Sequence, residues 1–119
     1  MTDYSNLVER YVDVWNEPDP ARRLAGVREL WTEDGVYVAK SVEARGHRAI
    51  EARIADEHAL LVAKRGYRFR AAYNADGHHN VLKFNWQMLP KDGGEVAAVG
   101  FDFFVLGDDG RIRADYQFI

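Results

Sequence analysis

The chain has 119 residues, a formal net charge of −3 and a hydrophobic content of 47%, which suit one folded domain over residues 1–119 and exclude intrinsic disorder. It has no cysteine, which excludes disulfides, thiolate metal sites and a cysteine nucleophile, and its sixteen basic residues are scattered among acids, which argues against nucleic-acid binding. Because no apolar run is long enough for a bilayer and the amphipathic N-terminus is unlike a signal peptide, we expect a cytoplasmic protein without membrane partners.

Three helices are predicted in the first half of the chain. Apolar residues recur at helical spacing over residues 3–16, and the segment NEPDP ends this helix because proline cannot continue the hydrogen-bond ladder. A second helix is predicted over about 20–31. A third is predicted over 47–64, and its apolar stripe includes His58.

The remaining elements read as β-strands. A short strand is predicted at 36–38, before the third helix. The segments 67–74, 78–89, 95–106 and 111–119 alternate between apolar and polar residues and are separated by turns that contain glycine. This order predicts an α+β fold, in which the helices pack on one face of a curved sheet that ends in a four-strand antiparallel meander.

Asp102 is a carboxylic acid in the middle of the most apolar strand, VGFDFFVL. Alternation places it with the even-numbered residues 98–106, opposite the odd-numbered residues 99–105, and both faces are apolar. One face should therefore cover the core and the other a partner. Because burial disfavours the charged form, we predict that Asp102 lines a pocket in its protonated form; the alternative is a carboxylate that bonds a neighbouring side chain or amide.

The ordered segments LWTEDGVYV, EARGHRAIEARI and VGFDFFVLGDDGRI resemble the NTF2-like superfamily and, within it, the SnoaL-like, ketosteroid-isomerase-like branch. The resemblance covers essentially the whole chain. It implies a cone in which three N-terminal helices pack on a strongly curved, mainly antiparallel sheet around a deep apolar pocket. It also implies a homodimer formed through the outer sheet face. Because this fold hosts several enzyme classes and non-catalytic binders, function has to be argued from the site.

The resemblance further implies that Tyr11 and Asp102 form an oxyanion hole. In ketosteroid isomerases an aspartic acid at the matching position is a protonated donor, and the tyrosine of a similar first helix is the other donor. Either residue could instead be satisfied locally within the core. The family's general base, an aspartate at the end of the first strand, is replaced here by Ala39, which cannot move a proton.

Two histidines are candidate substitutes for that base, because imidazole titrates near neutral pH. His58 lies on the stripe of the third helix, and His78 shares the predicted concave face of its strand, although a lone histidine in such a place can equally be a core residue. The histidines lack metal-ligand spacing, so neither a metal nor a cofactor is expected. Ligand contacts are predicted for Trp15, Ala39, Phe84, Trp86, Phe104 and Tyr116.

Two functions remain open at this point. The first is an acid–base isomerase, cyclase or lyase that acts on an apolar carbonyl or polycyclic substrate, with Tyr11 and Asp102 as oxyanion donors. The second is a non-catalytic small-molecule-binding or accessory protein of the same fold. The Tyr11–Asp102 pair favours the enzyme, and Ala39 favours the binding protein. Both functions predict a small apolar ligand.

Overall fold

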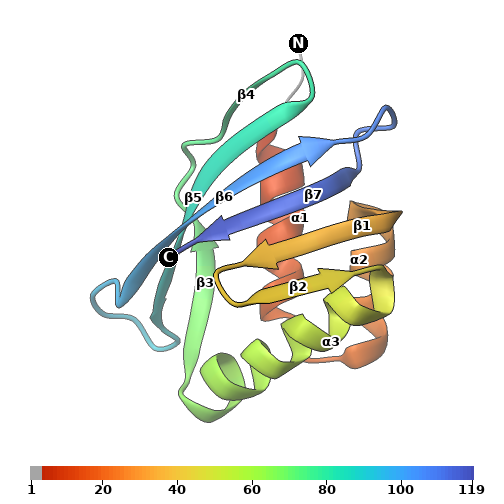
Figure 1. Ribbon diagram of the computed structural model, residues 1–119. Helices are drawn as coiled ribbons and strands as arrows, with labels where there is room; N and C mark the ends of the chain where they lie inside the picture. The colour runs from red at the N-terminus through yellow and green to blue at the C-terminus, as the bar shows by residue number, and fades with distance from the viewer. Residues whose placement is uncertain (1–3) are drawn as a thin grey trace.

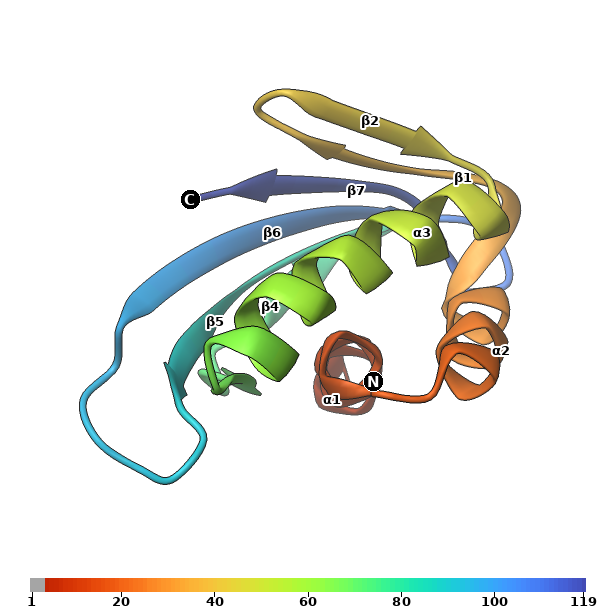
Figure 2. The ribbon, with the colours of Figure 1, turned by 90° about the horizontal axis from the view of Figure 1, so that it is seen from below.

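The computed structural model describes residues 4–119. Three α-helices, α1 (Tyr4–Asn16), α2 (Pro20–Leu30) and α3 (His47–Glu57), pack against one face of a curved seven-stranded sheet (Figure 1). Seen from below, the sheet bends over α1 and α3 (Figure 2). Within the described range, no helix has the length and apolar character needed to cross a membrane.

The sheet is mainly antiparallel. Its strand order is β2-β1-β7-β6-β5-β3, with the short strand β4 also paired to β5, and the single parallel pair is β1 with β7. The strands are β1 (Trp31–Ala39), β2 (Val42–Arg45), β3 (Tyr67–Ala71), β4 (Asp76–His78), β5 (Val81–Pro90), β6 (Ala98–Leu106) and β7 (Ile112–Phe118). Three helices on a curved, mostly antiparallel sheet confirm the predicted α+β cone.

Three predicted elements differ from the structure by more than their end residues. The strand predicted at 36–38 begins at Trp31 and forms a hairpin with β2, because the polar segment 32–35 is an irregular part of β1 and not a turn. The third helix is α-helical only to Glu57 and continues as the π-helix η1 (His58–Lys64). The strand predicted at 78–89 is interrupted by a turn at 79–80, where His79 has a φ of +52°.

The core lies between α1 and the concave face of the sheet. Tyr11 sits at its centre, with ring centroids 5.0 Å from Phe104 and 5.6 Å from Phe84. Phe84 and Phe104 are fully buried in this core. They were expected on the pocket wall, and the structure corrects this, because α1 covers the part of the sheet on which both side chains stand.

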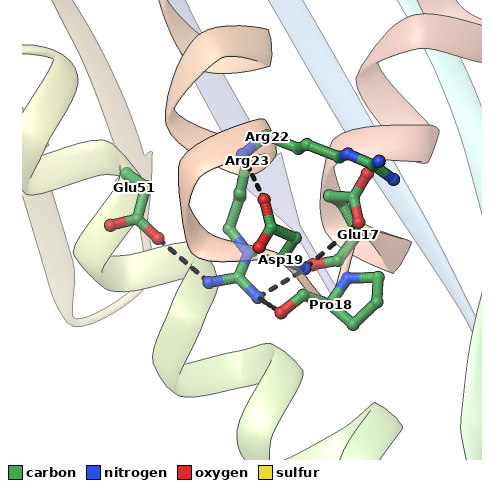
Figure 3. A network of polar contacts seen from close by, with 6 residues as sticks. All are labelled: Glu17, Pro18, Asp19, Arg22, Arg23 and Glu51. Carbon is green, nitrogen blue, oxygen red and sulfur yellow. Dashed lines mark hydrogen bonds and ion pairs between the residues drawn. The ribbon is translucent and has the colours of Figure 1, made fainter.

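Arg23 fixes the arrangement of the three helices (Figure 3). Its side chain is buried, its Nη1 lies 3.0 Å from Glu51 Oε2 on α3, and its Nε and Nη2 donate to the carbonyl of Glu17 at 3.1 and 2.8 Å. Asp19 caps α2 by accepting from the Arg22 backbone N–H at 2.9 Å. This ion pair and cap hold the α1–α2 connection against α3, and so set the position of α1 under the sheet.

Candidate ligand-binding site

A cavity of about 580 Å³ lies between α1, α3, η1 and the concave face of the sheet. We call its most buried part the floor, formed by Tyr11, Trp15, Phe69 and Trp86, and its exposed edge the mouth, which includes Lys40, Ser41, Tyr116 and Phe118. The volume and the aromatic lining are typical of small-molecule sites.

Asp102 lies directly behind the floor. It is fully buried and does not line the cavity. Its Oδ1 accepts from Trp86 Nε1 at 2.7 Å and from Gln117 Nε2 at 3.3 Å, and its Oδ2 lies 3.0 Å from the Tyr11 hydroxyl. A ligand in the cavity would therefore touch the three donors and not the carboxyl group. This corrects the expectation that Asp102 itself lines the pocket.

Trp86 reaches Asp102 because residue 100 is a glycine. Trp86 and Gly100 are opposite each other on β5 and β6, and a Cβ atom on Gly100 would lie 2.0 Å from Cζ2 of the indole. The indole therefore occupies the space that a side chain at residue 100 would fill. This close approach directs Nε1 along β6 to the carboxyl group two residues away.

Asp115 on β7 is a second buried carboxylic acid at the same place, and the sequence analysis missed it. Its Oδ2 lies 2.6 Å from the Tyr11 hydroxyl, and its Oδ1 has no hydrogen-bond partner within the described residues. Burial raises the pKa of Asp115 well above its usual range, and the adjacent Asp102 raises that pKa further. Both causes favour the uncharged form of Asp115.

The hydrogen atoms in this cluster can be assigned by counting. Tyr11 touches both carboxyl groups but has one hydrogen to donate, so one of its two contacts needs a hydrogen from an acid. Asp102 already accepts from Trp86 and Gln117, whereas Asp115 Oδ1 has no partner among residues 4–119, which an uncharged carboxyl group tolerates better than a carboxylate does. We therefore infer that the Asp115 carboxyl group donates to the Tyr11 oxygen and that the Tyr11 hydroxyl donates to Asp102 Oδ2. In this arrangement Asp102 accepts, which differs from the donor role expected from the resemblance.

Tyr37 extends the cluster across β1. Its hydroxyl donates to Gln117 Oε1 at 2.6 Å, which turns the amide so that its nitrogen faces Asp102. Burial, and then the nearby Asp115, raise the pKa of Tyr37, whereas the Arg53 guanidinium acts in the opposite direction. Burial and Asp102 also raise the pKa of Tyr11 well above its usual range. Both phenols are therefore neutral donors at physiological pH.

Three of the lining residues that the structure describes have charged side chains, two on α3 and one between β1 and β2. Arg53 Nη2 is 2.7 Å from Glu57 Oε1 one helical turn away, and Glu57 is the one carboxylate side chain among the described lining residues. Lys40 occupies the two-residue turn between β1 and β2. Strand alternation predicts opposite directions for Lys40 and Ala39, but the turn brings both to the cavity.

The predicted ligand-contact residues divide into two groups. Trp15, Ala39, Trp86 and Tyr116 line the cavity together with Tyr11, so their contact with a ligand stays a prediction that the geometry allows. Phe84 and Phe104 do not line it. Trp86 is thus the one predicted aromatic of β5 and β6 that α1 leaves open to the cavity.

Neither predicted catalytic histidine belongs to this site. His58 is buried in the packing of α1, α2 and η1 away from the cavity, and burial, followed by Arg23, lowers its pKa. His78 is exposed at the β4–β5 turn, with its Nδ1 3.2 Å from that of His79. Over residues 4–119, no three His, Asp or Glu side chains are grouped so that they could hold a metal ion.

The sequence matches the SnoaL-like domain family over residues 8–114. The chain therefore belongs to the SnoaL-like family, within the NTF2-like superfamily. A crystal structure of a presumed isomerase of this family from Agrobacterium tumefaciens strain C58 is 33% identical in sequence, has a TM-score of 0.88, and aligns with 99% of this chain and 97% of its own.

More distant structures show the same fold. A presumed polyketide cyclase from Sinorhizobium meliloti is 14% identical, with a TM-score of 0.72 over 95% of this chain and 94% of its own. A SnoaL-like protein of unknown function from Burkholderia thailandensis is 12% identical, with a TM-score of 0.72 over 99% of this chain and 97% of its own. At these identities the likeness concerns the fold alone. No protein with a curated description matches the sequence.

Proposed function

We propose that this protein is a small-molecule enzyme of the isomerase or cyclase type, which moves a proton on an apolar carbonyl compound held in the cavity. The observation that carries this proposal is the Tyr11 hydroxyl, which lies at the floor between two buried carboxyl groups at 2.6 and 3.0 Å. Such a cluster costs stability, because burying acids without a cation is unfavourable. A role in proton transfer explains why the cost is tolerated.

In the proposed reaction, the substrate's carbonyl oxygen comes to the floor beside Tyr11. The hydroxyl turns from Asp102 to this oxygen, while the Asp115 acid continues to donate to the phenol oxygen. Glu57, as the carboxylate in the wall, takes a proton from the carbon next to the carbonyl, and the electron pair forms an enolate whose oxygen Tyr11 stabilises. If the substrate has a β,γ-double bond, Glu57 returns the proton to the γ-carbon and the double bond moves into conjugation with the carbonyl. If the enolate carbon instead attacks a second carbonyl, a ring closes and the proton on Glu57 goes to the new alkoxide oxygen.

A non-catalytic binding protein is the second candidate. Two observations favour it: Ala39 stands where the family has its base, and the single Tyr11 hydrogen is already used inside the protein. In that case the polar cluster only orients the floor residues, and the cavity stores or carries its ligand unchanged.

Deuterium exchange separates the two candidates without knowledge of the natural substrate. The bicyclic ketone 2-tetralone is incubated in D₂O, and loss of its α-proton signals is followed by NMR. The wild type should accelerate exchange, and Tyr11→Phe should reduce the acceleration by roughly 10²–10³-fold, the usual effect of losing one oxyanion donor. Glu57→Gln should also reduce it, while leaving ketone binding, measured by tryptophan fluorescence, unchanged.

Tyr73→Phe is the matched control, because the side chain of Tyr73 is 75% exposed and does not line the cavity. This variant should exchange the ketone as fast as the wild type. If the wild type binds 2-tetralone but leaves its exchange at the buffer rate, the enzyme proposal is overturned and the binding protein remains.

A further inference from the structure

We propose that the natural ligand of this cavity carries an acidic group at one end, held by Lys40 at the mouth and attracted by the charge of Arg53 in the wall, and an apolar body that lies on the floor. The inference rests on the proposed function in one respect, which is that the cavity is the ligand site. It holds for a substrate and for a ligand that is bound without reaction.

Apart from the Tyr11 hydroxyl, which can turn to a substrate carbonyl, the floor has few hydrogen bonds left to offer. Tyr11, Trp86 and Gln117 all donate to Asp102, and the Gln117 carbonyl oxygen is used by Tyr37. What remains there is largely the faces and edges of aromatic rings, which favour an apolar body and disfavour a strongly polar one. The polar end of a ligand therefore belongs at the other end of the cavity.

Positive side chains outnumber negative ones in the lining of the cavity. Two cations, Lys40 and Arg53, and one carboxylate side chain, Glu57, line this cavity. Glu57 pairs with Arg53 through a single contact at Nη2, and no ion pair of Lys40 is found in residues 4–119. This local excess occurs in a chain whose formal net charge is −3, so it is not a general property of the surface.

An anionic group matches this arrangement better than a neutral or a cationic one. A cation would compete with Arg53 for Glu57 and would face Lys40. A neutral group would leave the ammonium of Lys40 without a counter-charge beside an apolar cavity, where ionic attraction is stronger than in bulk water. A carboxylate, a sulfonate or an acidic enol can accept from the Lys40 ammonium, and its charge is also attracted by Arg53, whose guanidinium already contacts Glu57 and Tyr37.

Two fluorescent probes with the same ring system test this inference. 1-Anilinonaphthalene-8-sulfonate carries one sulfonate, and N-phenyl-1-naphthylamine lacks it. We expect the wild type to bind the sulfonate probe about tenfold more tightly than the neutral probe. This ratio corresponds to a difference of about 1.4 kcal/mol in binding free energy. The preference should fall as salt is added, because screening weakens attraction between charges near the surface.

Lys40→Gln should remove most of the preference for the sulfonate while leaving the affinity for the neutral probe unchanged. Lys91→Gln makes the same change of charge in the exposed β5–β6 loop, outside the cavity, and should bind both probes like the wild type. Ala39→Trp fills the cavity and should lower the affinity of the protein for both probes.

The outcomes separate the two proposals. If the wild type binds neither probe, the cavity is not a ligand site and the proposed function fails with it. If the neutral probe binds but the sulfonate probe binds no more tightly, or Lys40→Gln keeps the preference, this inference is overturned while the proposed function stands. Sulfonate binding that Ala39→Trp leaves intact takes place elsewhere on the protein, and also overturns the inference.

Discussion

At the scale of single residues, the chemistry of the site depends on which group holds one proton. The assignment of a proton to Asp115 predicts a pH dependence of stability. Its folded-state pKa is raised, so the folded chain keeps a proton that the unfolded chain releases above roughly pH 3.9. The free energy of unfolding should therefore decrease as the pH rises from that value through the folded-state pKa, by up to about 1.4 kcal/mol per pH unit.

Asp115→Asn keeps a hydrogen-bond donor to Tyr11 and cannot ionise, so this contribution to the pH dependence should disappear. Urea unfolding of the wild type and the variant between pH 4.5 and 8 gives the comparison, with the variant becoming relatively more stable as the pH rises. Two parallel stability curves would show that Asp115 does not hold the proton, and the direction assigned to the Tyr11 hydroxyl would have to be reversed.

At the scale of elements, the pairing of β5 with β6 places Trp86 over Gly100 and so builds the floor. Gly100→Ala should push the indole away, since the new Cβ would lie 2.0 Å from Cζ2, and should break the bond from Nε1 to Asp102. We expect a loss of roughly 1–3 kcal/mol, as for other overpacked core positions. Adding Trp86→Phe should recover part of that loss, because the smaller ring relieves the clash; strictly additive effects in urea unfolding would contradict this packing.

The elements also show which parts of the site could be predicted. Helical spacing placed Tyr11 on the apolar stripe of α1, and alternation placed Asp102 with the even-numbered residues of β6. The resemblance then assigned both to one site, and the structure brings them into contact. Asp115 could not be found in this way. Ile112 and Asp115 are both buried although they are three residues apart, because an irregularity near Leu106 shifts the β6–β7 register and breaks the alternation. The turn at 79–80 moved His78 off the predicted face for a similar reason.

At the scale of the whole molecule, the outer face of the sheet carries apolar side chains. Val99 is 54% exposed, and the ring of Phe101 on the same face lies 5.8 Å from that of Phe118, which also borders the mouth of the cavity. We predict a homodimer through this face, because exposed apolar patches commonly mark an interface. Light scattering should give twice the chain mass of 13.6 kDa for the wild type and the single mass for Val99→Glu. Val96→Glu, in the β5–β6 loop, should remain dimeric; a monomeric wild type would contradict the prediction.

The shape of the cone determines where a ligand can bind. We expect ligands to enter the concave cavity above the buried acids and not to bind the apolar outer face. A crystal structure with N-phenyl-1-naphthylamine bound tests this claim most directly. We predict electron density for the naphthalene ring between Trp15, Phe69 and Trp86, with Asp102 still bonded behind it. Density on the outer face beside Phe101 and Phe103, with the cavity empty, would contradict the account.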